Sequence, residues 1–181
     1  MKWFIASDIH GSAYYCEKMI ERYKEEKCDR MFFLGDILYH GPRNDLPRDY
    51  APKKVIAMLS EYKNETFSVC GNCDCAVDQM VLQFPVLAEY SVLDLGKRLI
   101  FLTHGHIYNE EKLLPMKQGD ILLSGHTHVP KCEEKNGFVF MNPGSVSIPK
   151  ENSTHSYMTL EGGTFLWKNI EDGKIYMEYK I

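Results

Sequence analysis

Residues 2–11 read KWFIASDIHG, a short apolar run that ends in an aspartate and a histidine. A continuous apolar run of this length, bounded by polar residues, is typical of a strand that is buried on both faces. Residues 14–27 follow with a helical pattern, in which Tyr15, Met19 and Tyr23 recur on one face. A buried strand that leads into an amphipathic helix predicts the first part of a β-α-β unit.

The alternation of strand and helix continues toward residue 71. Apolar runs at residues 30–35 and 66–71 predict two further buried strands. Residues 52–62 predict a helix with Pro52 near its first turn, where proline is tolerated. A polar loop that contains proline spans about residues 36–51. The β-α-β-α-β order predicts a parallel sheet with helices outside it.

The second half of the chain changes character, because short strands and tight turns such as Gly162-Gly163 replace the helices. The expected strands are residues 88–95, 97–104, 120–125, 137–142, 156–161, 164–170 and 174–180. We expect them to form mostly antiparallel hairpins. The sequence has no repeat, no low-complexity segment and no linker, so it predicts one α/β domain over residues 1–181 with two packed sheets.

Composition and charge narrow the class of protein. A chain of 181 residues with 44% hydrophobic and 25% charged residues has the balance of a globular domain with a sizeable core. The net charge of −4 argues against general nucleic-acid binding, which needs clustered Lys and Arg. We expect no signal peptide and no membrane span, and therefore a cytoplasmic protein whose six cysteines are reduced.

Side chains that can bind metal recur at the ends of five apolar runs. They are Asp8, His10, Asp36, Asn72, His104, His126 and His128. Because the carboxyl ends of parallel strands meet at one edge of a sheet, these side chains are expected to gather there. Each motif alone has an ordinary structural alternative, such as a cap, a turn or an exposed strand pair. The ordered set of five favours a metal site.

The donor types indicate which ions would bind. Imidazole and carboxylate together suit manganese, iron, cobalt, nickel or zinc better than calcium or magnesium. Seven ligands exceed what one ion takes, whereas two ions that share a bridging carboxylate would use them all. Such a pair can activate a bridging water and stabilise an in-line displacement at phosphorus. The clustered Cys70, Cys73 and Cys75 have no second pair of ligands, so no separate zinc site is predicted.

The ordered set Asp8-x-His10, Gly35-Asp36, Gly71-Asn72, His104-Gly105 and Gly125-His126-x-His128 resembles the calcineurin-like metallophosphoesterase superfamily over nearly the whole chain. The stretches LGDILYHGPRNDLP, GNCDCAVDQM, THGH, GHTH and NPGSVSIPK are similar to the small bacterial phosphodiesterases of the YfcE type. The resemblance implies an α/β/β/α sandwich of two mixed β-sheets flanked by helices. It also implies hydrolysis of a small phosphodiester by a hydroxide that bridges two metal ions, with manganese as the expected ion.

The resemblance also implies a role for each ligand. One ion would be bound by Asp8, His10 and His128, and the other by Asn72, His104 and His126. Asp36 would bridge the two ions, and Asp36, Asn72 and His104 would be the catalytic residues. The residues alone predict only the set and not this division.

The sequence departs from the family pattern at Cys73, where many members have a histidine that is thought to protonate the leaving group. An unperturbed thiol has a pKa of about 8.5, against about 6.5 for imidazole, so it suits acid catalysis at neutral pH less well. Cys73 either donates a proton weakly or packs in the site, and we favour packing. The hypothesis that follows is a preference for good leaving groups, and for diesters over alkyl monoesters.

Other residues are candidates for substrate contacts, each with an ordinary alternative. Arg43 offers a planar fork for a phosphate, although it could form a surface salt bridge. His106 is expected to line the substrate cleft rather than only end a loop. His40 and Asp74 are each balanced between the site and a loop or turn, and His155 is expected at the surface. Asn142 and Ser145 are expected to belong to a structural loop.

The principal alternative function is a binding scaffold on the same fold, as in the small retromer subunit, which resembles these enzymes and serves as an interaction platform. Such a role would tolerate missing ligands, whereas all seven positions are filled here. A metallo-β-lactamase-type hydrolase is less favoured, because its His-x-His-x-Asp-His signature is absent. Strand edges and apolar loops would allow a homo-oligomer, either a dimer or a tetramer.

Overall fold

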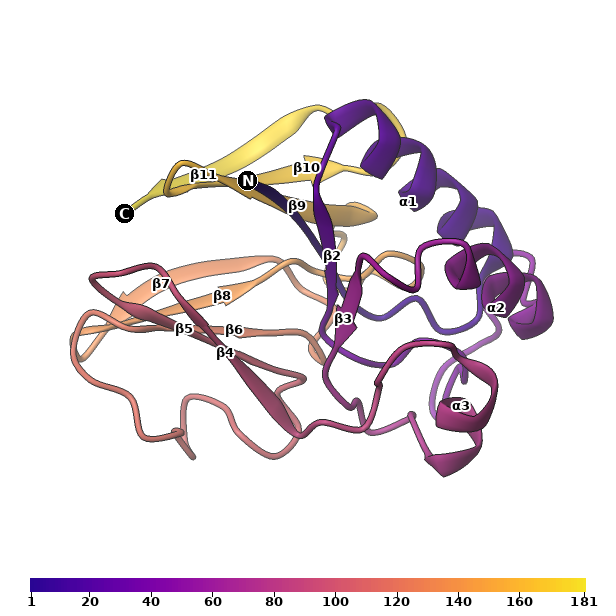
Figure 1. Cartoon of the computed structure of the whole chain (residues 1–181), viewed down its shortest axis with the longest axis horizontal. Helices are drawn as coiled ribbons and strands as arrows, with labels where there is room; N and C mark the ends of the chain where they lie inside the picture. The colour runs from indigo at the N-terminus through magenta and orange to yellow at the C-terminus, as the bar shows by residue number, and fades with distance from the viewer.

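The computed structural model describes residues 1–181 and consists of two β-sheets packed face to face (Figure 1). The first sheet has the order β11-β10-β9-β1-β2-β3, and the second has the order β4-β5-β6-β8-β7. The strands of the first sheet are β1 (Lys2–Ala6), β2 (Arg30–Phe33), β3 (Thr66–Ser68), β9 (Ser156–Glu161), β10 (Thr164–Asn169) and β11 (Ile175–Lys180). The strands of the second sheet are β4 (Tyr90–Asp94), β5 (Leu99–Thr103), β6 (Ile121–Ser124), β7 (Lys131–Lys135) and β8 (Phe138–Asn142).

Each sheet contains a parallel group of three strands with antiparallel strands beside it. In the first sheet, β1, β2 and β3 are parallel, as the β-α-β-α-β order predicted. In the second sheet, β5, β6 and β8 are parallel, so the expectation of mostly antiparallel hairpins fails for the pairs β5–β6 and β6–β8. It holds for β4 with β5 and for β9, β10 and β11, which are antiparallel. Parallel pairing requires a long crossover, which the segment 104–120 supplies between β5 and β6.

The side chains of the strands alternate between two buried layers, as the period of two residues in a strand requires. Phe4 and Ala6 of β1 belong to the core between the first sheet and the helices, whereas Ile5 belongs to the core between the two sheets. On β5, Ile100 likewise faces the layer between the sheets, and its neighbour Phe101 faces a smaller cluster on the outer side. These two central strands are therefore buried on both faces, which explains their continuous apolar sequences.

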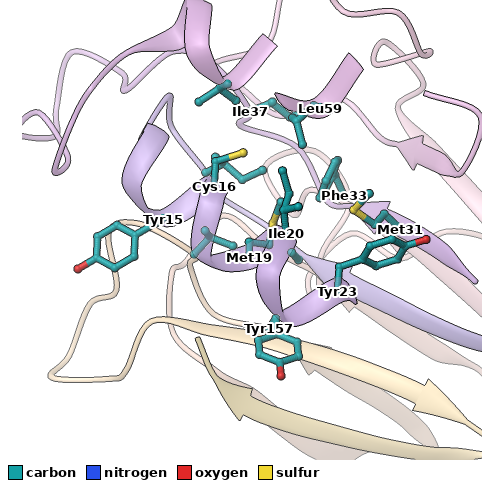
Figure 2. Packing of buried hydrophobic residues seen from close by; sticks show 14 of the residues in the cluster. Tyr15, Cys16, Met19, Ile20, Tyr23, Met31, Phe33, Ile37, Leu59 and Tyr157 are labelled. Atoms are coloured by element: carbon teal, nitrogen blue, oxygen red, sulfur yellow. The ribbon is translucent and has the colours of Figure 1, made fainter. Parts of the chain in front are cut away.

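The helices gather on one side of the molecule (Figure 1). They are α1 (Ala13–Glu26), α2 (Pro52–Ser60) and α3 (Ala76–Val81). Ser12 caps the N-terminus of helix α1, because its Oγ accepts a hydrogen bond of 3.3 Å from the Tyr15 backbone N–H. Figure 2 shows Cys16, Met19 and Tyr23 of this helix packed into the same cluster as β2 residues.

The predicted architecture of two mixed sheets is confirmed, with two differences in its elements. The outer face of the second sheet is covered by the segment 104–120 rather than by a helix, with Leu114 packed on Phe101 and Phe140. Helix α3 and strand β7 were not predicted. Helix α3 has only 6 residues, which is too short to show a helical period, and most residues of β7 are charged. No helix has the length and apolar character needed to cross a membrane.

Candidate active site

The predicted metal ligands gather where the carboxyl ends of both parallel groups meet. Asp8 and His10 follow β1, Asp36 follows β2, and Asn72 follows β3. His104 follows β5 in the second sheet, and the segment with His126 and His128 follows β6. All seven predicted ligands are brought to one region, as expected for the carboxyl edges of parallel strands.

The first group of atoms in this region contains Asp8, His10 and His128. The Nε2 atoms of the two histidines lie 3.3 Å apart, and Asp8 Oδ1 lies 3.5 Å from the Nε2 of His10 and 3.2 Å from that of His128. His10 Nδ1 donates to the Tyr39 carbonyl at 2.7 Å, and His128 Nδ1 donates to the Ile148 carbonyl at 2.6 Å. In neutral histidines both Nε2 atoms are then acceptors. Three acceptors therefore face one another without a donor.

The second group contains Asn72, His104 and His126. His104 Nε2 lies 3.0 Å from Asn72 Oδ1 and 3.3 Å from His126 Nδ1. His104 Nδ1 donates to the Leu34 carbonyl at 2.6 Å, which leaves its Nε2 as an acceptor directed into the group. This arrangement is typical of a metal-binding histidine, whose far ring nitrogen donates a hydrogen bond to a carbonyl.

Asp36 lies between the two groups. Its Oδ2 is 3.6 Å from His10 Nε2 in the first group and 3.4 Å from His104 Nε2 in the second. Its Oδ1 accepts a hydrogen bond of 2.8 Å from the Cys73 backbone N–H, which fixes the orientation of the carboxylate. One carboxylate oxygen is therefore within reach of both groups.

The electrostatics of the site favour added positive charge. Burial alone would raise the pKa of Asp8, but the close approach of His10 and His128 to its carboxylate, at 3.5 and 3.2 Å, and the nearby histidine charges hold the pKa well below its usual value. Burial opposes the charged form of His104, yet the approach of Asp36 Oδ2 to within 3.4 Å of its Nε2 and the charges of Asp8 and Asp36 raise the pKa of His104 to about 9. Asp8 Oδ1 is buried without a hydrogen-bond partner. The donor set and this orphaned oxygen fit a bound divalent cation.

The backbone at the site is strained. Five of the seven predicted ligands have positive φ angles, between 47° for His10 and 68° for His126. The left-handed region is unfavourable for residues with a side chain, at a cost of about 1–3 kcal/mol each. Such strain is typical of functional sites, where the surrounding structure enforces a geometry that the chain would not adopt alone.

Asp74 holds the segment that carries Asp36. Its carboxylate accepts hydrogen bonds from the backbone N–H groups of Gly71 at 2.7 Å, Asp36 at 2.8 Å and Ile37 at 2.9 Å. Burial raises its pKa, and these three hydrogen bonds oppose that rise. Asp74 therefore positions the ends of β2 and β3 and does not contact Cys73 through its side chain.

Asn142 and Ser145 support the ligand loops through backbone contacts. Asn142 Nδ2 donates to the Gly125 carbonyl at 2.6 Å, and Ser145 Oγ donates to the Asp8 carbonyl at 2.8 Å. Neither side chain forms a hydrogen bond with a histidine ligand. The interpretation of this segment as a structural loop is therefore the correct one.

Comparison with known proteins places this arrangement in a family. Residues 1–164 match the calcineurin-like phosphoesterase superfamily domain. The chain belongs to this superfamily. It is 42% identical to the phosphodiesterase YfcE of Escherichia coli K12 over 181 residues, which cover 100% of this chain and 98% of that protein. This full-length similarity and the family match identify the chain as a phosphoesterase.

Solved structures support the same family. The structure of Yfce, a phosphoesterase from E. coli, matches with a TM-score of 0.96 at 42% identity, covering 100% of both chains. Vacuolar Protein Sorting 29 from Cryptosporidium parvum matches with a TM-score of 0.61 at 22% identity, covering 99% of this chain and 98% of that one. At that identity the second match shows the shared fold alone. The metallophosphoesterase fold of the chain is thus confirmed.

The phosphoesterase has a polar cavity of about 750 Å³ beside the clustered ligands. Arg43 and Cys73, two of the predicted substrate contacts, line it. His106 is exposed next to the second group, with its ring centre 5.3 Å from that of His104, but it does not line this cavity. Burial and the charge of Asp36 raise the pKa of the half-buried Cys73 thiol to about 12.

For one further residue the structure decides between two predicted positions, for a second the observed position differs from the predicted one, and a third residue, in the cavity lining, was not predicted. His40 packs its ring against Tyr50 and lies outside the cavity lining, so it belongs to the loop. The expectation that His155 lies at the surface is wrong, because its ring is half-buried and stacks on Tyr15 with centres 3.8 Å apart. Lys150 lines the cavity and was not predicted. The only sequence feature that could have indicated a role for Lys150 is its place at the end of the motif NPGSVSIPK.

Proposed function

We propose that this phosphoesterase is a phosphodiesterase that binds two divalent metal ions, with manganese as the expected ion. The observation that carries the proposal is the pair of convergent acceptor groups with Asp36 Oδ2 within 3.6 Å of one and 3.4 Å of the other. Asp8, His10 and His128 would bind one ion and Asn72, His104 and His126 the other, with Asp36 bridging. Zinc, iron, cobalt and nickel also suit these donors.

The ions would supply a nucleophile, by lowering the pKa of water held between them, and positive charge for the phosphoryl oxygens. The chain prepares the site for them. Carbonyl groups accept from the Nδ1 atoms of His10, His104 and His128, which fixes each ring and leaves each Nε2 free. Asp36, Asn72 and His104 hold the reacting region together, as the proposed catalytic residues.

A preference for diesters is supported by the similarity to the E. coli phosphodiesterase YfcE over 100% of this chain. It is also supported by Cys73. A thiol is a weak acid beside imidazole, so it gives little assistance to an alkoxide leaving group at neutral pH. Cys73, Arg43 and His106 remain the proposed substrate contacts, and a small phosphodiester is the proposed substrate.

The scaffold alternative rests on the fold alone, because the Vacuolar Protein Sorting 29 matches are below 25% identity. Seven filled ligand positions favour catalysis, since an interaction platform does not require them. We further propose that residues 1–181 act as one domain in the cytoplasm, where the six free cysteines would stay reduced. Assembly as a dimer or tetramer is part of the same proposal.

The test is to remove metals with a chelator, restore single divalent ions, and measure hydrolysis of bis-p-nitrophenyl phosphate beside p-nitrophenyl phosphate. We expect diester turnover that depends on the restored ion and is lost in His126→Ala. A diester-to-monoester ratio above one supports the argument from Cys73. Bound ions without turnover of either compound would contradict the enzymatic proposal and favour the scaffold.

A further inference from the structure

The cavity beside the ligands is larger than the scissile group requires. Its volume of about 750 Å³ is in the range of sites that bind whole small molecules. Two cationic side chains line it in addition to the ligands, Arg43 and Lys150. Both side chains are exposed and available to a ligand.

Neither cation has a partner within the chain. Arg43 and Lys150 form no ion pair, and neither side chain forms a hydrogen bond. The carboxylates that line the same cavity are those of Asp36 and Asp74. Asp74 is occupied by three backbone N–H groups, and Asp36 lies between the two acceptor groups. The two positive charges are therefore left for a ligand.

The loop around Arg43 is held against the second group of ligands. Asn44 Nδ2 donates to the His40 carbonyl at 2.8 Å, which closes the turn that presents Arg43. Gly41 packs so closely on this side that a Cβ atom there would lie 3.0 Å from Cys73 Sγ. Arg43 is thus carried by a loop that is packed against the segment following Asn72.

Lys150 is held against the first group. Its backbone N–H donates to the His128 carbonyl at 3.2 Å, and its own carbonyl accepts from Ser153 Oγ at 2.6 Å. His128 in turn donates through Nδ1 to the Ile148 carbonyl, two residues before Lys150. The two cations therefore enter the cavity from segments attached to different ligand groups.

We infer that Arg43 and Lys150 form an anion subsite for a second anionic group of the substrate, a phosphate or a carboxylate on the arm that extends beyond the scissile diester. This inference rests on the proposed function. A guanidinium fork and an ammonium group both bind such oxyanions through charge-assisted hydrogen bonds. The substrate class is then a phosphodiester with at least two negative charges, and not a simple monoanionic diester.

The test compares three non-hydrolysable methylphosphinates, in which carbon replaces both ester oxygens of the diester, on the manganese-loaded protein. Their single arm is n-butyl, 3-carboxypropyl or 3-phosphonopropyl, so they differ in the charge at the end of the arm. Dissociation constants are measured by titration calorimetry for the wild type, Arg43→Met, Lys150→Met and the control Lys53→Met. Lys53 is exposed on α2 and lies outside the cavity lining, so its substitution makes the same change of charge elsewhere.

We expect at least one charged arm to bind roughly fivefold or more tightly than n-butyl, and the difference to shrink at high salt. The ratio of the affinity for the charged arm to that for n-butyl should fall toward one in Arg43→Met and in Lys150→Met, and it should persist in Lys53→Met. The better of the two charged arms identifies phosphate or carboxylate. Equal binding of all three phosphinates by the wild type, or a charged-to-butyl affinity ratio that persists in both cavity variants, would overturn the inference.

Hydrolysis of bis-p-nitrophenyl phosphate by the same preparations separates this inference from the proposed function. Turnover without a preference among the arms overturns only the subsite. A preference among the arms without turnover supports the subsite and overturns the phosphodiesterase proposal.

Discussion

Asp8 is fully buried, and its Oδ1 atom has no hydrogen-bond partner although it faces two histidine Nε2 atoms. A buried acceptor that faces other acceptors is unfavourable until a cation joins them. In the metal-free protein the neighbouring histidines supply positive charge that holds the pKa of Asp8 down, and a bound ion would supply it instead. This role explains why a residue so costly to bury lies at the end of a central strand.

The first prediction follows from this residue. Asp8→Asn should lose most of the increase in unfolding temperature that manganese gives the wild type, because a neutral amide replaces the carboxylate of the first group. The chelator-treated variant should also be less stable than the wild type, by about 1–3 kcal/mol in the free energy of unfolding, because the neighbouring histidine charges that hold the pKa of Asp8 down lose their partner. Both effects are measured by thermal unfolding with and without manganese. An increase with manganese as large as that of the wild type would contradict the argument.

Asp74 gives a second prediction at this scale. Asp74→Ala leaves three buried backbone N–H groups without an acceptor, each costing about 1–3 kcal/mol if water does not replace the carboxylate. We expect a loss of about 2–4 kcal/mol in unfolding free energy, measured by urea titration, and a fall in diester turnover of more than tenfold because Asp36 moves. Asp74→Asn keeps one acceptor oxygen, so its unfolding free energy and its turnover should lie between those of the wild type and Asp74→Ala. Wild-type turnover in Asp74→Ala would show that Asp36 is positioned without it.

At the scale of elements, the ends of β2 and β3 approach so closely that only glycine fits at position 71. A Cβ atom there would overlap the backbone nitrogen and Oδ1 of Asp36. Gly71→Ala should therefore lower the free energy of unfolding by about 2 kcal/mol or more and weaken the response of the unfolding temperature to manganese. Gly96→Ala is the matched control, because Gly96 has a φ of 84° and open space around it. It should cost only about 1 kcal/mol for its backbone angle and leave the metal response intact.

Two features of the sheets could not be predicted from local sequence patterns, namely the edge strand β7 and the direction of pairing in the second sheet. Strand β7 has no apolar alternation, because it is an edge strand with charged side chains that face solvent. The Asn136-Gly137 turn that joins it to β8, with both φ angles positive, was the signal that could have revealed it. The parallel pairing of β6 with β5 and β8 was not predicted, since strand direction is set by the connections between strands and not by the strand sequences.

At the scale of the whole molecule, Glu26 joins the end of α1 to the first sheet. Its carboxylate accepts from Lys2 Nζ and Lys168 Nζ, each at 2.6 Å, and from the Tyr157 hydroxyl at 3.0 Å. Burial raises the pKa of Glu26, but the hydrogen bonds from Lys168 and Lys2 outweigh it, and the net pKa is lowered. A lowered pKa in the folded state stabilises the protein above the unfolded-state pKa, and this contribution is lost as the pH falls.

Glu26→Gln should therefore destabilise the protein at pH 7 by about 2–4 kcal/mol, because the buried Lys168 loses its counter-charge. The unfolding temperature of the wild type should drop more steeply than that of the variant as the pH falls below about 4.5, the ordinary value for a glutamate. Glu25→Gln is the control, since Glu25 is 61% exposed in its pair with Arg22. The same dependence of unfolding temperature on pH in the wild type and in Glu26→Gln would contradict this role of Glu26.

The sequence by itself determined the seven candidate ligands and the parallel group β1, β2 and β3. Each ligand directly follows a strand whose burial is encoded in its own apolar residues, so its position at a sheet edge can be predicted from neighbours in the chain. The family resemblance came from the same short motifs. Local spacing was therefore sufficient for the set of site residues.

Only the tertiary structure decided how these residues meet and what surrounds them. His10 and His128 approach to 3.3 Å across 118 positions, and Asp74 holds Asp36 across 38 positions. The cavity wall that joins Arg43 to Lys150 likewise combines segments distant in the chain. No local pattern encodes such contacts, because the packing of two sheets and their crossovers sets the distance between residues that are remote in sequence.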